Sequence, residues 1–229
     1  MSIRRLQYQI DYTHIITFKE EYKPIIMPYF SFDGLEYAID NENSIHESVR
    51  LIFRKENLAI FIRKEGLTFM FEGDINDLKN SNGVIKFFWD IFEQIKSLKG
   101  YIKSTRHALI VHEVSIKEKD EVESILNNPP FFSLNPFGAL NEFSCIYEFN
   151  KSDILHKLQF GNYSQKDIPL HDLSPFRTSF NKDLFDNVGM MARLELVELE
   201  KTPTHSKFKS ILSKAEECIS SLNIFENGK

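Results

Sequence analysis

Three short apolar runs constrain the fold of this chain more than any other feature. The runs cover residues 50–53, 58–62 and 67–71, are rich in Leu, Ile and Phe, and are separated from one another by only a few residues. Runs of this length and composition are typical of β-strands. Because connections as short as 64–66 cannot make a crossover, consecutive strands have to run antiparallel. The sequence therefore predicts an antiparallel meander over 50–71.

The apolar spacing then changes from that of strands to that of a helix. The apolar positions are Val84, Phe87, Phe88, Ile91, Phe92, Ile95 and Leu98. Steps of three and four residues place these side chains on one face of an amphipathic α-helix. Ser81 or Asn82 can supply its N-cap, and Gly100 stands where a helix commonly ends. We predict that Phe88, Phe92 and Ile95 are buried against a sheet.

The rest of the chain predicts further strands and two more helices. Alternation of apolar and polar residues predicts strands at 6–18, 101–116, 143–149, 154–160 and 190–199. Helical spacing predicts a short helix at 117–126 and a terminal helix opened by Pro203. The predicted buried stripe of the terminal helix is Phe208, Ile211, Leu212, Ala215, Cys218, Ile219 and Leu222. Pro24 and Pro28 are expected to interrupt the chain before a hairpin signal at 33–34.

This order of elements predicts an α+β fold. Its 21 Phe and 8 Tyr residues favour sheets over a helical bundle. We expect two mainly antiparallel sheets or lobes, each packed by a long helix, and a weak internal duplication. The 229 residues are expected to form one compact unit. Within it we expect lobes at 1–126 and 142–229, joined by a Pro- and Phe-rich crossover at 127–141.

Composition excludes several classes of protein. With 28 Lys and Arg against 33 Asp and Glu, the net charge is −5, which argues against nucleic acid as the main partner. The N-terminal residues lack the apolar stretch of a signal peptide, and no window is apolar enough for a transmembrane helix. Cys145 and Cys218 form no C-x-x-C pair, and two isolated cysteines are typical of a protein from a reducing compartment. We therefore expect a cytoplasmic protein without a membrane partner.

The known catalytic and cofactor-binding motifs are absent from the sequence. It contains no G-x-S-x-G, no P-loop and no G-x-G-x-x-G. None of the seven histidines belongs to an H-E-x-x-H motif or an i, i+4 pair. We accordingly expect no cofactor, no metal site and no catalytic residue.

Arg106 and His112 are the binding residues that the sequence nominates. They lie on one face of a predicted strand, with Ala108 and Ile110 between them, whereas His107 and Glu113 face the other side. Both side chains suit an anion or a carboxylate. Six strand residues span about 20 Å, so a partner that contacts both has to be extended. The alternative interpretation is that each side chain only meets neighbouring polar groups of its own sheet.

An acidic group before the predicted 84–98 helix supports a second hypothesis. Glu72, Asp74 and Asp77 follow a predicted strand, where two-metal hydrolases place carboxylates, and His112 could join them. The same residues suit a loop whose side chains satisfy backbone donors. A third hypothesis is a small-ligand cup between a curved sheet and a long helix.

The order of elements resembles that of a sporadically distributed family of uncharacterised prokaryotic proteins. The resemblance rests on the helix with Trp89 and Phe92, the strand with Arg106, and the C-terminal segment LSKAEECI at 212–219. Members carry an aromatic residue and Asn after the strand arginine, where this chain has Ile-Val-His at 110–112. The resemblance implies a cytosolic accessory protein of a mobile-element or host-defence system, with no known reaction.

Together these observations favour a non-enzymatic binding or interaction protein. Its partner is expected to be another protein, and a homo-oligomer stays open. The metal-dependent hydrolase and the small-ligand cup are the alternatives.

Overall fold

The structure is a computed structural model. It describes residues 2–16, 18–42, 44, 46–80, 82–127, 144–151, 153–163, 188–199 and 202–226.

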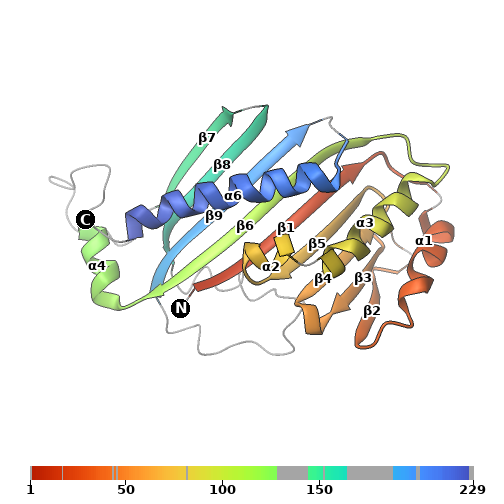
Figure 1. The fold of residues 1–229 in the computed structure, drawn as a ribbon, viewed down its shortest axis with the longest axis horizontal. Coiled ribbons are helices and arrows are strands. Elements are labelled where there is room, and N and C mark those ends of the chain that lie inside the picture. The colour runs from red at the N-terminus through yellow and green to blue at the C-terminus, as the bar shows by residue number, and fades with distance from the viewer. Residues whose placement is uncertain are drawn as a thin grey trace.

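A single nine-stranded antiparallel sheet forms the body of the described chain (Figure 1). The strand order across the sheet is β2-β3-β4-β5-β1-β6-β9-β8-β7. The first five strands are β1 (Ser2–Tyr12), β2 (Leu35–Asp40), β3 (Ser48–Phe53), β4 (Leu58–Arg63) and β5 (Gly66–Glu72). The other four are β6 (Ser104–Lys117), β7 (Ser144–Lys151), β8 (Ile154–Tyr163) and β9 (Val188–Leu199).

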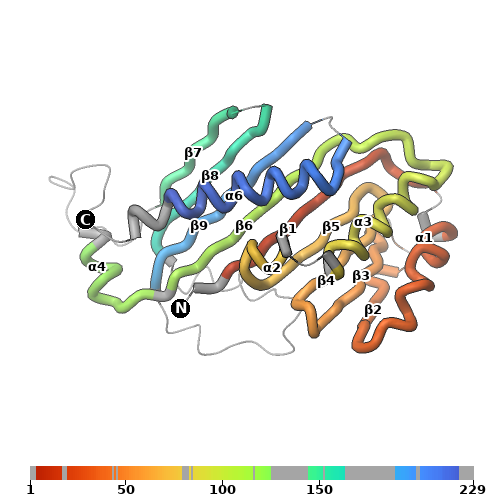
Figure 2. The backbone as a smooth tube through the Cα atoms, in the orientation of Figure 1, coloured from red at the N-terminus to blue at the C-terminus, as the bar shows by residue number. Residues whose placement is uncertain are grey.

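The prediction of two sheets, each packed by a long helix, is wrong. In the first group of strands, β1 to β5, the last strand β5 pairs with the first strand β1. In the second group, β6 to β9, the last strand β9 pairs with the first strand β6. This arrangement leaves one free edge on β1 and one on β6, and the two edges pair with each other, for example at Tyr8 and Leu109. The backbone trace shows these two strands side by side in the middle of the sheet (Figure 2). The shared pairing makes one continuous sheet.

The helices of the described chain are α1 (Phe18–Ile26), η1 (Met27–Tyr29), η2 (Arg54–Glu56), α2 (Ile75–Asn80), α3 (Asn82–Lys96), α4 (Lys119–Asn127) and α6 (His205–Glu226). Helices α3 and α6 lie across the same face of the sheet (Figure 1). The predicted crossover at 127–141 lies outside the described residues, apart from its first residue at the end of α4.

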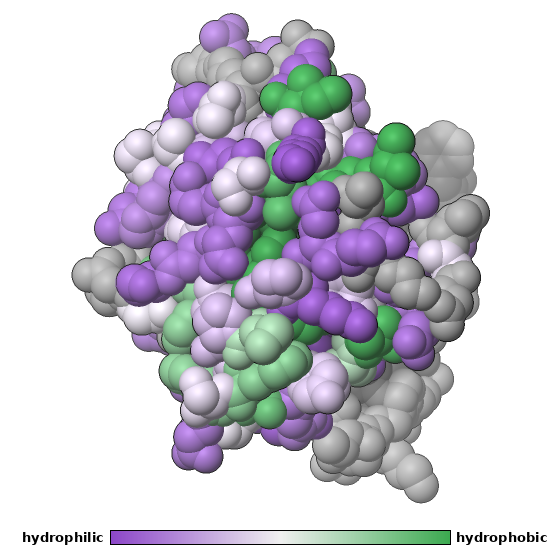
Figure 3. Space-filling view, turned by 90° about the vertical axis from the view of Figure 1, so that its right-hand side faces the viewer, coloured by the Kyte–Doolittle hydropathy of each residue, from purple (hydrophilic) through white to green (hydrophobic). Residues whose placement is uncertain are grey.

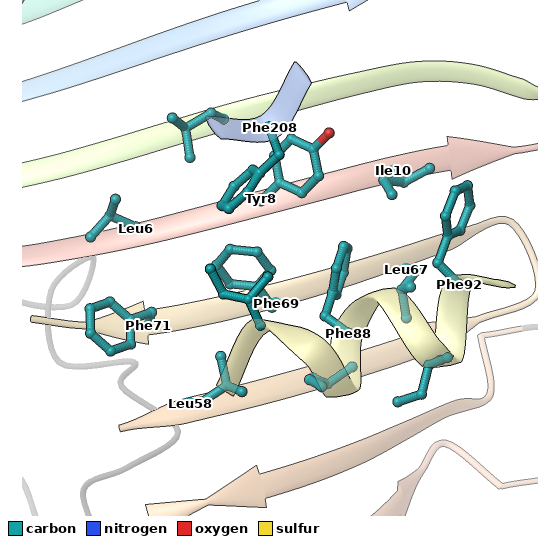
Figure 4. Close-up of a cluster of buried hydrophobic side chains, with 14 of the residues drawn as sticks. Leu6, Tyr8, Ile10, Leu58, Leu67, Phe69, Phe71, Phe88, Phe92 and Phe208 are labelled. Atoms are coloured by element: carbon teal, nitrogen blue, oxygen red, sulfur yellow. The ribbon is translucent and has the colours of Figure 1, made fainter. Parts of the chain in front are cut away.

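The hydrophobic core lies between the sheet and these helices. Alternate residues of the central strands, such as Tyr8 on β1 and Phe69 on β5, point toward α3 and α6 (Figure 4). Phe88 and Phe92 of α3 and Phe208 of α6 meet them and are fully buried. Ile95 is 1% exposed, so the predicted orientation of the 84–98 helix is confirmed.

The terminal helix begins slightly later than its proline indicated. Pro203 precedes the helix, and the Thr204 hydroxyl accepts a hydrogen bond from the backbone N–H of Lys207 at 3.3 Å, which is an N-cap contact. The predicted stripe is buried at Phe208, Ile211, Leu212, Ala215 and Ile219.

Helix α1 is an element that the proline pattern concealed. Pro24 lies inside it, although proline in a helix interior removes one hydrogen bond. Tyr22, Ile25 and Ile26 of α1 are nevertheless buried, which offsets that cost. Strand β1 accordingly ends at Tyr12, earlier than the predicted end at residue 18.

Candidate functional site

Arg106 lies on the face of the sheet opposite the helices, within a row of alternating charges. Its Nη1 is 3.2 Å from Asp11 Oδ2 on β1, and its Nη2 is 2.8 Å from Glu195 Oε1 on β9. The other Glu195 oxygen is 3.0 Å from Arg193 Nη2. Two carboxylates of the chain therefore already engage the donors of Arg106, which is the arrangement that the alternative interpretation described.

His112 lies on the same face as Arg106, between arginines on both neighbouring strands. Arg5 of β1 is directly opposite it on one side and Arg193 of β9 on the other. The structure places Arg106 and His112 on one face, as the alternation predicted, and does not bring them together. Their role in binding stays a prediction.

Two of the three acidic residues before α3, Glu72 and Asp74, have side-chain contacts within the chain. Arg5 donates from Nε and Nη2 to Glu72 Oε1, at 3.2 and 2.8 Å. Asp74 Oδ1 accepts from the backbone N–H of Asn76 at 2.7 Å, as in an Asx turn. Within the described ranges, no three His, Cys, Asp or Glu side chains are grouped closely enough to hold a metal ion. The geometry of the described residues gives the hydrolase hypothesis no specific support.

A buried polar chain crosses the core beneath the start of α6. Tyr8 Oη is hydrogen-bonded to His107 Nδ1 at 3.0 Å, and His107 Nε2 lies 3.0 Å from Glu198 Oε2. Burial, with the Glu198 charge as a smaller cause, raises the pKa of Tyr8 far above its ordinary value, so its hydroxyl stays protonated. Because all three residues are buried, these contacts stabilise the core, and the three side chains are not accessible to a partner.

Large apolar side chains are exposed where η1 and β2 meet, and we call them the aromatic surface. It comprises Met27, Phe30, Phe32 and Tyr37, which are 63%, 46%, 36% and 59% exposed. The Phe30 and Tyr37 rings are 4.7 Å apart between centroids. The view of this end of the molecule shows hydrophobic residues at the surface among hydrophilic ones (Figure 3). Contiguous exposed apolar side chains of this kind mark interaction sites more often than isolated ones do.

An open groove of about 570 Å³ adjoins the aromatic surface, and we call it the α3 groove. Its lining residues are Pro28, Tyr29, Ser31, Phe32, Lys86, Phe87, Asp90, Glu93 and Gln94. Three aromatic rings lie together in it, because the Phe87 centroid is 5.5 Å from that of Tyr29 and 4.9 Å from that of Phe32. Burial, and to a smaller extent Asp90, raises the pKa of Tyr29 to about 12.

Apart from Pro28, the remaining lining residues make a polar rim with both signs of charge. Lys86 Nζ lies 2.6 Å from Asp90 Oδ2, one helical turn along α3. Glu93 is paired in turn with Lys96, at 2.6 Å. Since these charges are paired within the chain, the rim has no strong preference for a small anion or cation. Side chains with an apolar body and a polar end fit this combination of lining groups.

Sequence reasoning missed both the aromatic surface and the α3 groove. The segment at 28–34 was interpreted only as an interruption and a turn, although it contains three aromatic residues in a stretch of seven. Aromatic residues crowded into a predicted loop were the available signal, because a loop has no core face to bury all of them.

The fold and the groove define an α+β protein with one helix-covered antiparallel sheet and a partly apolar surface groove. In comparisons with known proteins, no family model and no curated protein matches the chain. Among the described residues, no helix is both long and apolar enough to cross a membrane.

Proposed function

We propose that this chain is a non-enzymatic interaction protein that binds a segment of another polypeptide in the α3 groove. The observation that carries the proposal is an apolar floor inside a polar rim, next to exposed aromatic side chains. The aromatic floor of Tyr29, Phe32 and Phe87 suits a large apolar anchor side chain of the partner. The rim offers donors and acceptors to the polar groups on either side of that anchor.

The shape of the groove favours a polypeptide over a small ligand. Small-ligand sites enclose most of the surface of what they bind. The α3 groove is open, and through Phe32 it continues into the aromatic surface, where Phe30 and Met27 extend the apolar area. An elongated partner can contact both parts at once. We place this function in the cytoplasm, in an accessory role in mobile-element or host-defence systems, on the sequence and the family resemblance alone.

The test is selection of peptides from a random display library on the folded wild-type protein. The selected peptides are expected to share an aromatic or branched aliphatic residue. Their affinities are then measured by fluorescence anisotropy for Gln94→Trp, which fills the groove from α3 with a large side chain. We expect binding to weaken at least about tenfold, since the anchor loses its space.

Ser213→Trp is the matched control, because Ser213 is exposed on α6 and does not line the groove. Circular dichroism of each variant verifies its fold. Peptides that bind the wild type, Ser213→Trp and Gln94→Trp with equal affinity would contradict the proposal. A library that yields no specific binder would contradict it as well.

A further inference from the structure

Strand β2 is the edge strand beside the aromatic surface, and its hydrogen-bonding phase can be worked out from the sheet. The two-residue turn between β4 and β5 makes Arg63 and Gly66 a hydrogen-bonded pair. Residues of an antiparallel strand direct their backbone N–H and C=O groups alternately toward one neighbouring strand and the other. Because Arg63 bonds toward β5, Ile60 of β4 bonds toward β3. By the same alternation, Arg50 of β3 bonds toward β2. Ala38, opposite Arg50, therefore directs its backbone groups inward to β3.

It follows that the neighbours of Ala38 direct their backbone groups away from the sheet. Tyr37 and Ile39 each present an N–H and a C=O on the outer edge of β2. The N–H of Leu35, which has the same phase, donates to the carbonyl of Phe32 in the preceding turn at 3.3 Å, in agreement with this assignment. Within the described part of the chain, no strand pairs with this edge. The edge is thus a template for strand addition.

We propose that the strand added here is β2 of a second copy of this chain, antiparallel, with Tyr37 opposite Tyr37 of the partner subunit. A two-fold axis through this position brings Leu35 opposite Ile39 of the partner subunit, and Glu36 opposite Ala38 of the partner subunit. On the helix side of the sheet, Leu35, Tyr37 and Ile39 then meet only apolar or aromatic side chains. On the other side, the Glu36 carboxylate, which is bound by Arg54 of its own chain, faces the methyl group of Ala38 of the partner subunit.

Strand overlap and charge together favour this register, with Glu36 paired to Arg54 and Asp40 paired to Arg50 in each copy. An axis at Glu36 would pair only residues 35–37 of β2 and would set two glutamates, each bound to Arg54 of its own chain, against each other. An axis at Ala38 would oppose Glu36 to Asp40 of the partner subunit. If the partner strand slid by one residue along β2 from any of these registers, backbone groups that point outward on one copy would face backbone groups that point inward on the other. The register centred on Tyr37 pairs residues 35–39 without opposing two carboxylates, while the N–H of Leu35 stays bonded to the carbonyl of Phe32.

The aromatic surface supplies the apolar area of this interface. Tyr37 is 59% exposed, and Phe30, 46% exposed, lies against its ring. At the two-fold axis, Tyr37 and Phe30 of one copy meet Tyr37 of the partner subunit and Phe30 of the partner subunit, and Met27 lies beside them. The paired edges add about four backbone hydrogen bonds, two at the tyrosine pair and one at each flanking pair. The dimer and the proposed function share the aromatic surface, but the dimer does not require an occupant of the α3 groove, and in the dimer a bound polypeptide is confined to that groove.

The first experiment measures the oligomeric state by analytical ultracentrifugation from about 1 to 100 µM, because dimers of this kind depend on protomer concentration. The wild type is expected to shift from the 26.9 kDa monomer to a species of twice that mass. Tyr37→Lys puts two like charges at the axis and is expected to give the monomer throughout. Ile146→Lys is the control, because Ile146 is 61% exposed on β7, at the opposite edge of the sheet.

The second experiment tests the register by cross-linking in a background with Cys145→Ser and Cys218→Ser. Opposed residues of a hydrogen-bonded pair have Cα atoms about 5.5 Å apart, within the range that a disulfide spans. Tyr37→Cys is therefore expected to form a covalent dimer on mild oxidation. Glu36→Cys is expected to stay monomeric on a denaturing gel, because its copies would be about 8 Å apart and a disulfide reaches only about 7 Å.

Three results would overturn the inference. One is a wild type that stays monomeric over the whole concentration range. Another is a dimer that Tyr37→Lys leaves intact or that Ile146→Lys also abolishes. The third is cross-linking of Glu36→Cys at least as efficient as that of Tyr37→Cys. Because the peptide test uses Gln94→Trp, each of these results leaves the proposed function to be judged separately.

Discussion

Replacing Phe92 with Ala tests the packing of α3 on the sheet most directly. The Phe92 side chain is fully buried, with the Trp89 ring 6.0 Å and the Tyr101 ring 6.4 Å away between centroids. Burial of such a side chain contributes about 1.5–3 kcal/mol, and the cavity left by truncation raises the total cost to about 3–5 kcal/mol. We expect about 4 kcal/mol, because Trp89, held by the helix, and Tyr101, held by its hydrogen bond to Ser104, cannot collapse into the space.

The measurement is thermal unfolding followed by circular dichroism, supported by urea titration. For a chain of this length each kcal/mol corresponds to about 2–4 °C, so the midpoint should fall by about 8–16 °C. Ile102→Ala is the control, because Ile102 is 78% exposed and its loss should change the free energy of unfolding by less than about 0.5 kcal/mol. A midpoint for Phe92→Ala within about 3 °C of the wild type would refute the placement of this helix face in the core.

Four further predictions concern polar groups and metal ions. Tyr8→Phe should lower the free energy of unfolding in urea by about 1–3 kcal/mol, because it leaves the buried His107 ring without its hydroxyl partner. Because burial raises the pKa of Tyr29 to about 12, the unfolded chain, whose tyrosines ionise near pH 10, loses this proton first. Stability should therefore fall as the pH rises from about 10 to about 12, and Tyr29→Phe should lessen that fall. Arg106→Ala should cost about 1 kcal/mol in the same urea assay, because the ion pairs that it breaks are partly exposed. Calorimetric titration with Mn²⁺ or Zn²⁺ should show no stoichiometric binding, and a micromolar site would support the hydrolase instead.

Elements that are determined by nearby residues could be predicted from the sequence. The meander at 50–71 was predicted because a short turn leaves consecutive strands no other geometry. The strands predicted at 143–149 and 154–160 from alternation are β7 and β8. Helix α3 was predicted because its apolar face is wide and regular. Helix α1 was not, because Pro24 weighs against a helix locally, whereas the burial of Tyr22 that stabilises it is a tertiary effect.

The joining of the two groups of strands into one sheet could not be predicted in the same way. The central pairing joins β1 to β6, and their paired residues, such as Leu6 and Val111, lie about a hundred positions apart. Each strand alternates apolar and polar residues whether its second edge is paired or exposed to water. Alternation therefore determines which side chains face the helices and leaves open which strand lies alongside.

The same limit explains how Arg106 and the groove residues were interpreted. On its own strand, Arg106 has apolar neighbours on its face, which makes it resemble a binding residue. Its carboxylate partners come from β1 and β9, and only the sheet register shows that they are adjacent. The groove presents the opposite case, since Phe32 and Phe87 belong to segments that appear unrelated in sequence and meet only in the fold. Arg106, the side chain that stands out on its own strand, thus already has its carboxylate partners on the neighbouring strands. The surface that stays available to a partner arises where a loop and a helix come together.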